Sequence, residues 1–439
     1  MGRRRNLQYA VQGKSGPNRR AFRRPATHRN VNEELFNRPD LSEHPVTAAS
    51  VSEHSAHVRQ LLEPLLSRAP ETVTVADALT RVAHSDVHSP VDLPLFRNSQ
   101  MDGYAVRSSD IAAVPASLHV VGTVAAGPSE SRKITAGTAV KIMTGAPIPD
   151  GADAVVPVEN TESHGSVVTI AVTRRSGEYI REQGSDITAG TLLVQAGQVL
   201  EPRHIAVLAA VGLSHIDVRS RPRVAVITTG AELVDAGSTL GPGQIYDSNG
   251  VTLASHLRAS GAEVVAVHRS SDDADAFRRI LSEATASAEL VITSGGVSMG
   301  DFEVVKDVLQ PLGGTFGSVR MQPGGPQGTA VVDGIPVLNF PGNPVSTVVS
   351  FLVFAREVIR EAAGLPPLPD QFVPLKESIT SIPGRRQFLR GKVHDGEVSL
   401  IAGPGSHLVA AMAWANVLLD IPADTTELVA GTEVQVMPL

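Results

Sequence analysis

Glycines, hydroxyls and acids gather in one short stretch in the second half of the chain. Residues 290–309 read LVITSGGVSMGDFEVVKDVL, an apolar run followed by a small-residue loop and a helix-like pattern. Glycine lets a ligand approach the backbone, and the N–H groups at a helix start bind anions. Carboxylates repel that anion unless a divalent cation lies between them. The loop residues that could act in this way are Ser294, Gly295, Gly296, Ser298, Asp301 and Glu303.

Similar residue types follow the other apolar runs between residues 222 and 344. Acids again stand beside small residues, a combination that favours a phosphate-bearing ligand bound together with magnesium. Structural alternatives exist: Asp247 and Asp272 could cap helices, and the two glycines could form an ordinary turn. The joint occurrence is the stronger indication because separate loops carry it. These loops contribute Thr229, Gly230, Glu232, Asp247, Asp272, Pro341, Gly342, Asn343 and Pro344.

Strand-like and helix-like patterns alternate from residue 222 to residue 364, which predicts an α/β domain with a mostly parallel sheet and helices on both faces. Ligands bind such sheets at the carboxyl ends of the strands, where the loops above should meet. The predicted strands are 223–230, 262–269, 289–296 and 335–342. The predicted helices are 248–261, 272–286, 302–313 and a long one over 343–364.

The rest of the chain predicts further domains, so the fold class is α/β plus β. Helical and linker patterns at 51–85 and 182–221 flank a β-rich insertion at 86–181, which has short alternating segments and many Gly and Pro residues. Ser50 or Ser52 is the expected cap of the first helix. A second small β domain is expected over 365–439. Residues 1–50 form a tail with no apolar stripe, typical of a solvated, disordered extension.

Composition excludes several classes of protein. The absence of cysteine removes disulfides, thiolate metal sites and a cysteine nucleophile, so any metal needs oxygen or histidine ligands. The first 30 residues hold nine of the 38 basic residues and none of the 45 acidic ones. No membrane span or signal peptide is predicted, no specific nucleic-acid partner is expected, and the cytoplasm is the expected location.

Ordered motifs over about residues 51–439 resemble the MoeA family of molybdopterin molybdenumtransferases and the similar E domain of gephyrin. They are SQMDGYAV (99–106), MTGAPIPDGADAVVPVE (143–159), TTGAEL (228–233), IYDSN (245–249), TSGGVSMGD (293–301) and FPGNPVS (340–346). The resemblance implies a MogA-like, molybdopterin-binding α/β domain, a C-terminal small β-barrel, and a homodimer whose sites are shared between subunits.

The implied reaction takes adenylyl-molybdopterin and molybdate, releases AMP and leaves molybdenum on the pterin, with magnesium assisting. Asp102 and Thr144 would reach the site from the β-rich insertion of the other subunit. Glu232, Asp272 and Glu303 would be catalytic acids and, with Asp301, metal ligands. The resemblance adds as pterin contacts Arg320, Gln322, Pro323, Gly324, Ser346, Arg385 and Arg390. Other proteins of molybdenum cofactor biosynthesis would be its partners.

The chain departs from the family in the loop MQPGGPQG (321–328), where Gln322 and Gly325 stand in place of lysines. A neutral amide cannot replace a point charge, although Arg320 lies two positions earlier on the same predicted strand face. The departures leave a second hypothesis open, a non-catalytic protein that binds the pterin or serves as a scaffold. A third, the nucleotide-cleaving competence-damage family, lacks the MDGYA motif.

Overall fold

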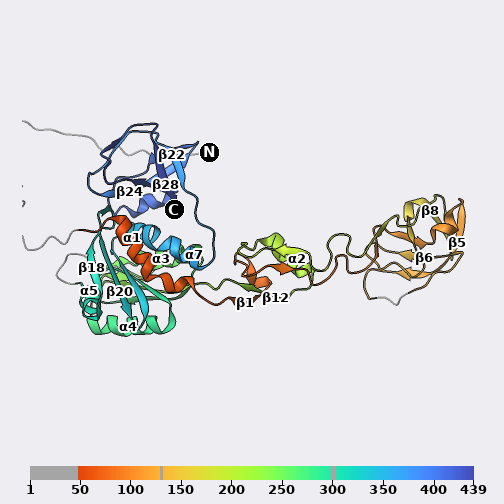
Figure 1. Cartoon of the computed structure of the whole chain (residues 1–439), viewed down its shortest axis with the longest axis horizontal. Coiled ribbons are helices and arrows are strands. Elements are labelled where there is room, and N and C mark those ends of the chain that lie inside the picture. The colour runs from red at the N-terminus through yellow and green to blue at the C-terminus, as the bar shows by residue number, and fades with distance from the viewer. Residues whose placement is uncertain (1–47, 129–131, 298–302) are drawn as a thin grey trace, which may run out of the picture. The chain divides into compact units, whose positions relative to one another are not determined.

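The computed structural model describes residues 48–128, 132–297 and 303–439 (Figure 1). Residues 48–439 form one compact unit by their contacts. Within the described residues, no helix combines the length and apolar character that crossing a bilayer requires. Residues 1–47 of the predicted tail (1–50), together with Ser298 and Asp301 of the glycine loop, lie outside the described residues. The last part of that tail is ordered, because Ala49 exchanges backbone hydrogen bonds with Ser318 and Arg320.

An open sheet of six strands lies at the centre of the α/β domain, in the order β16-β13-β17-β21-β20-β18. Four strands are parallel, as predicted: β16 (Glu263–Ser270), β13 (Arg223–Thr229), β17 (Leu290–Ser294) and β21 (Ile335–Phe340). The other two strands, β20 (Pro326–Val332) and β18 (Thr315–Ser318), are antiparallel and were not predicted from the sequence. β20 meets β21 through a tight turn at Asp333 and Gly334, both with positive φ. The fold class, α/β plus β with a mostly parallel sheet, is confirmed.

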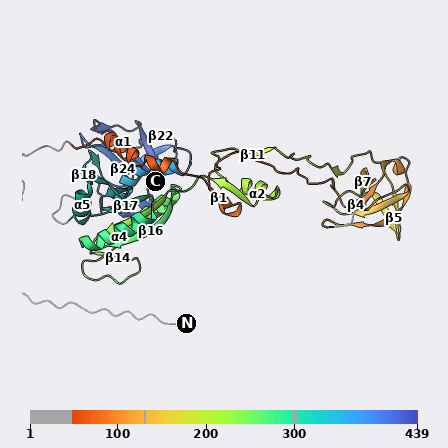
Figure 2. The same cartoon turned by 60° about the horizontal axis from the view of Figure 1, so that its bottom comes forward.

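Successive residues of the central strands pack into two separate cores, because side chains alternate between the two faces of a sheet. Val224, Val226 and Leu338 pack with α1, α3 and α7, whereas Ala225 and Val291 pack with α4 and α5. The two views show these helix groups on opposite faces of the sheet (Figure 1 and Figure 2). The helices are α1 (Val51–Leu61), α3 (Ser248–Ala259), α4 (Ala274–Ser287), α5 (Val304–Leu309), α6 (Pro344–Ser350) and α7 (Arg356–Ala362).

The long predicted helix over 343–364 is interrupted. A π-helical turn, Phe351–Ala355, separates α6 from α7. This turn packs against α1, where Phe354 meets His54 edge-on with ring centroids 4.6 Å apart. Hydrophobic periodicity does not distinguish a π turn from the α-helix around it, which is why the interruption was missed.

Helix α1 packs against a different domain from the one to which the sequence assigned it. Its start is as predicted, because Ser50 caps it through a capping box with Glu53. Val51, Val58 and Leu62 however enter the core beneath the α/β sheet, and not the small core of residues 75–83 and 194–218. That small core contains α2 (Pro202–Ala210) and the antiparallel pair β1 (Glu71–Thr74) and β12 (His215–Val218). Helical periodicity shows which face is apolar but not which partner covers it.

The β-rich insertion contains a six-stranded sheet in the order β7-β4-β6-β5-β9-β8. Its strands are β4 (Gly103–Val106), β5 (Ala116–Val124), β6 (Thr138–Ile142), β7 (Ala154–Pro157), β8 (Thr161–His164) and β9 (Val167–Ile170). Two apolar clusters lie on its two faces, since Tyr104 and Val106 enter one and Ala105 the other. The insertion is thus a packed β module with its own core.

The C-terminal β domain includes a strand from the loop that precedes β20. Strand β19 (Met321–Gln322) pairs in parallel with β24 (Arg386–His394) at the edge of a sheet. The sheet continues through β26 (Val417–Ile421), β28 (Glu433–Pro438) and β22 (Gln371–Pro374), while β25 (Glu397–Leu400) pairs with β24. Hydrogen bonds of β19 therefore join the α/β domain to the C-terminal domain beside the predicted site.

Candidate active site

A cavity of about 1050 Å³ opens where the carboxyl ends of β13, β17 and β21 meet the β19 loop and the C-terminal domain. Its lining includes most residues that the sequence nominated, from loops up to about 150 residues apart in the chain. They are Thr229, Gly230, Glu232, Asp247, Asp272, Ser294, Gly295, Gly296, Glu303, Arg320, Gln322, Pro323, Gly324, Pro341, Gly342, Asn343, Pro344, Ser346 and Arg385. Asp102, Thr144 and Arg390 do not line it.

The glycine loop approaches its neighbours so closely that only glycine fits. Gly295 has a φ of 101°, and a Cβ there would lie 2.6 Å from Oγ1 of Thr229. At Gly296, with φ of 67°, a Cβ would lie 2.6 Å from a methyl group of Val305. Both positions need left-handed backbone that other residues adopt at a cost. The pair therefore shapes the loop as well as exposing its backbone to the cavity.

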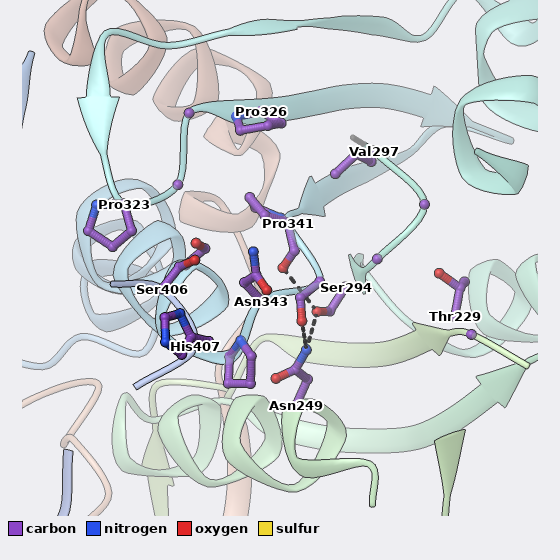
Figure 3. Close-up of a pocket in the computed structure, with 18 of the residues that line it drawn as sticks. Thr229, Asn249, Ser294, Val297, Pro323, Pro326, Pro341, Asn343, Ser406 and His407 are labelled. Carbon is purple, nitrogen blue, oxygen red and sulfur yellow. Dashed lines mark hydrogen bonds between the residues drawn. The ribbon is translucent and has the colours of Figure 1, made fainter. Parts of the chain in front are cut away.

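Ser294 joins three loops by hydrogen bonds (Figure 3). Its buried hydroxyl accepts from Nδ2 of Asn249 at 2.9 Å and lies 3.1 Å from Oγ1 of Thr347 and 3.3 Å from the Pro341 carbonyl. Nδ2 of Asn249 also donates to the Gly342 carbonyl at 2.7 Å. The sequence nominated Ser294 as a ligand contact, but its hydroxyl is engaged within the protein. Asn249 is the residue that ties the β17, β21 and α3 loops together.

Some of the acids have structural roles, and Asp247 combines such a role with a place in the cavity lining. Asp247 caps α3 through the N–H of Gly250 and accepts from Thr228 Oγ1 at 2.7 Å, which supports its capping role. Asp273 caps α4. The neighbouring Asp272 instead accepts from the N–H of Ala231 at 3.0 Å and faces the cavity. Asp272 is therefore not the helix cap. It connects the loop after β16 to the loop after β13.

Three acids of the lining fit a hard cation by their chemistry. Glu232, Asp272 and Glu303 offer carboxylate oxygens, the donors that magnesium prefers. The Glu232 carboxylate lies over the backbone of Gly230, where an added Cβ would meet its oxygens at 2.7 Å. Among the described residues, no three acids or histidines stand close enough to form a ready-made metal site. The three carboxylates have the donor chemistry of a hard-cation site, but within the described residues they do not by themselves surround an ion.

The loop in which the resemblance led us to expect lysines surrounds β19 and lines the same cavity as the acids. Arg320 and Gln322 both line the cavity, and Nη1 of Arg320 donates to the Ala48 carbonyl at 2.6 Å. Oε1 of Gln322 accepts from Nε2 of Gln387 at 2.5 Å. With Arg385, Arg320 supplies positive charge to this wall. Arg320 is therefore placed where it could supply part of the positive charge that lysines would give at Gln322 and Gly325.

Arg390 lies behind the lining and shapes it. The side chain is 2% exposed, and its guanidinium donates to the carbonyls of Gly403 and Gly405. The next residues, Ser406 and His407, line the cavity, and the Ser406 carbonyl accepts from the N–H of Val345 at 3.2 Å. This loop was not predicted from the sequence. Its run GPGSH resembles the other small-residue loops, but nothing in the sequence links it to the α/β domain.

Asp102 and Thr144 contact each other within the β-rich insertion. Oδ1 of Asp102 accepts from the backbone N–H of Thr144 at 2.6 Å and from its hydroxyl at 2.8 Å. These two hydrogen bonds, the backbone one first, lower the pKa of the Asp102 carboxyl below its usual value. The two residues predicted as a pair are thus one preorganised, ionised group on the surface of the insertion.

The arrangement defines a multidomain protein with a ligand cavity at the strand ends of an α/β domain, closed on one side by a β domain. Family models match most of the chain: the MoeA N-terminal region (domain I and II) at residues 49–212, a probable molybdopterin binding domain at 225–361 and the MoeA C-terminal region (domain IV) at 373–439.

Named relatives agree with these matches. Molybdopterin molybdenumtransferase 2 of Mycobacterium tuberculosis is 43% identical over 407 residues, which cover 89% of this chain and 99% of the relative. Molybdopterin molybdenumtransferase of a Nostoc species is 35% identical and covers 90% and 95%. The crystal structure of a molybdopterin biosynthesis MoeA protein from Pyrococcus horikosii superposes with a TM-score of 0.71 at 31% identity and covers 89% and 99%. The chain belongs to the MoeA family of molybdopterin molybdenumtransferases, as the motifs predicted.

Proposed function

We propose that this protein is a molybdenum insertase, which transfers molybdenum from molybdate to adenylyl-molybdopterin and releases AMP. The observation that carries the proposal is that Glu232, Asp272 and Glu303 line the same cavity as the glycine loop and the β19 wall. The cavity thus combines loop backbone that can bind anions with carboxylates that suit a cation. A substrate that carries phosphate and reacts with an oxyanion needs both kinds of group.

The chain's own residues hold and orient the substrate. The backbone of Gly295, Gly296 and Gly342 allows close approach of phosphate, while Arg320 and Arg385 offset its charge. Magnesium, held by Glu232, Asp272 and Glu303 together with Asp301, would stabilise negative charge on the departing AMP. The proposed roles of Asp301 and Ser298 rest on the sequence motif alone.

We further propose a cytoplasmic homodimer in which Asp102 and Thr144 of one subunit complete the cavity of the other. The proposal rests on their absence from the lining within one chain and on the ionised, preorganised state of Asp102. A second subunit is the simplest way to bring the Asp102–Thr144 pair to the cavity. Transfer of the finished cofactor to other proteins of the same biosynthesis would follow.

The test is AMP release by purified protein given adenylyl-molybdopterin, magnesium and molybdate. We expect stoichiometric AMP and molybdenum-loaded pterin, and loss of both in Glu303→Gln. Glu397→Gln, at an exposed acid of β25, is the matched control. Gln322 and Gly325 favour one alternative, a protein that binds the pterin without converting it. Tight pterin binding without AMP release would establish that alternative and reject the insertase.

A further inference from the structure

Two glutamines face each other across the junction of the α/β and C-terminal domains. Gln322 of β19 and Gln387 of β24 are register partners in the parallel pairing. Nε2 of Gln387 donates to Oε1 of Gln322 at 2.5 Å. Gln322 lines the cavity, whereas Gln387 is 2% exposed and lies behind it. The buried glutamine thus reaches the cavity through Gln322, which is half-buried.

Backbone chemistry determines which way both amides point. Oε1 of Gln387 accepts from the N–H of Ile382 at 3.2 Å and from the hydroxyl of Ser381 at 2.8 Å. A backbone N–H is always a donor, so the atom facing it must be the amide oxygen. The amide nitrogen of Gln387 then faces Gln322 and needs an acceptor there. Oε1 of Gln322 is that acceptor, and its Nε2 group is left for the cavity.

We propose that Gln387 is a positioning residue that holds Gln322 with its NH₂ group toward the oxyanion portion of the substrate. The inference rests on the proposed function and extends it to a residue outside the cavity. Gln322 stands where the family has a lysine, so the pair supplies two neutral N–H donors in place of one charge. Without Gln387, the amide of Gln322 could turn and present its oxygen, which repels an oxyanion.

The sharpest variant is Gln387→Glu. A carboxylate satisfies Ile382 and Ser381 as before but cannot donate to Gln322. The Gln322 amide is expected to reverse and donate to Glu, so its oxygen faces the cavity. We expect KM to rise about ten-fold with little change in kcat, since a good hydrogen bond to an anion is lost. A rise in KM for molybdate alone assigns the donor to molybdate, and a rise for adenylyl-molybdopterin alone assigns it to phosphate.

A double-mutant cycle separates positioning from the added charge. In the Gln322→Leu background, Gln387→Glu should change KM no further, because the residue it acts through is gone. An effect of the same size in both backgrounds would overturn the proposal, since the negative charge would then act directly. Gln371→Glu, at an exposed position of β22, controls for charge on the same domain. Thermal unfolding reports whether each variant is folded.

A measurement without substrate tests the orientation of Gln322 separately from the proposed insertase activity. In a protein with ¹⁵N-labelled glutamine, Gln322→Leu identifies the side-chain NH₂ signals of Gln322. We expect those protons to exchange rapidly with water in the wild type and slowly in Gln387→Glu, where they bond to the carboxylate. Slow exchange of Gln322 in the wild type would refute the orientation even if AMP is released. The expected exchange pattern without AMP release would instead refute only the insertase.

Discussion

Asp102 and Thr144 form a two-point contact in which one carboxylate oxygen accepts both the backbone N–H and the hydroxyl of the same threonine, at 2.6 and 2.8 Å. Both donors stabilise the charged form, so the pKa of Asp102 lies below its usual value of 3.8. The carboxylate therefore stays ionised throughout the physiological range. Its stabilising contribution is present above the usual pKa and is lost as the pH falls through the lower, folded value.

Thr144→Val should raise the pKa of Asp102, because it removes the hydroxyl donor and keeps the backbone one. We expect the acidic limb of the pH–activity profile to move to higher pH where Asp102 governs it. Carbon-13 NMR titration of the Asp102 carboxyl measures the shift directly, with Thr144→Ser as the control that retains the hydroxyl. An unchanged pKa in Thr144→Val would show that the backbone N–H alone determines it.

If each active site takes residues from both subunits, two inactive variants should complement each other in mixed dimers. Asp102→Asn and Glu303→Gln should each abolish AMP release as homodimers if both act in the reaction. Random mixed dimers place both lesions in one site and leave the other intact, so roughly a quarter of wild-type activity should return. Sites built within one chain would give no recovery. The measurement requires unfolding and refolding the two variants together, with each refolded alone as the control.

Gly295→Ala should damage both stability and activity. The added Cβ would lie 2.6 Å from Oγ1 and 2.8 Å from the carbonyl oxygen of Thr229, in backbone with φ of 101°. We expect a loss of about 1–3 kcal/mol in the free energy of unfolding, together with weaker substrate binding. Urea unfolding and AMP release measure the two effects. Gly317→Ala, where a Cβ meets nothing within 4 Å, should leave both close to wild type.

Arg390 and Arg385 should respond differently to the same substitution. Arg390→Met leaves the Gly403 and Gly405 carbonyls without their donor, so we expect a lower melting temperature and a higher KM. Because Arg390 is 2% exposed, little water is present to replace the lost donor. Arg385→Met removes a cavity-facing charge and should raise KM with an unchanged melting temperature. Equal melting temperatures for the two variants would contradict the loop-holding role.

His54 makes the docking of α1 sensitive to acid. Burial, with a smaller effect of His57, lowers its pKa from 6.5 to about 4. The unfolded chain therefore binds a proton that the folded protein does not, and stability falls as the pH drops from 6.5 toward 4. The loss is at most about 3 kcal/mol from this residue. Urea unfolding at pH 7.5 and 5 should show a smaller difference in His54→Leu than in the wild type.

Burial also lowers the pKa of His256, so the pH dependence should decrease in His54→Leu without disappearing. His394→Gln, at an exposed position of β24, is the control and should keep the full wild-type difference. An identical slope in His54→Leu and the wild type would place the acid sensitivity elsewhere.

Local patterns determined much of this protein from sequence alone. The parallel strands, the start of α1 at Ser50 and the strand-end loops all follow from periodicity, capping and small-residue chemistry over a few neighbours. The motifs also predicted the family. These features were predictable because each depends on residues that lie close together in the chain.

Contacts between distant segments were decided only by the tertiary structure. Nothing near Ser294 shows that Asn249 and Thr347 occupy its hydroxyl, and nothing near Arg390 shows that it holds the loop before His407. The pairing of Gln322 with Gln387 joins positions 65 residues apart. Side chains nominated for a ligand can instead satisfy buried polar groups of the protein, and the packed fold alone determines which of the two they do.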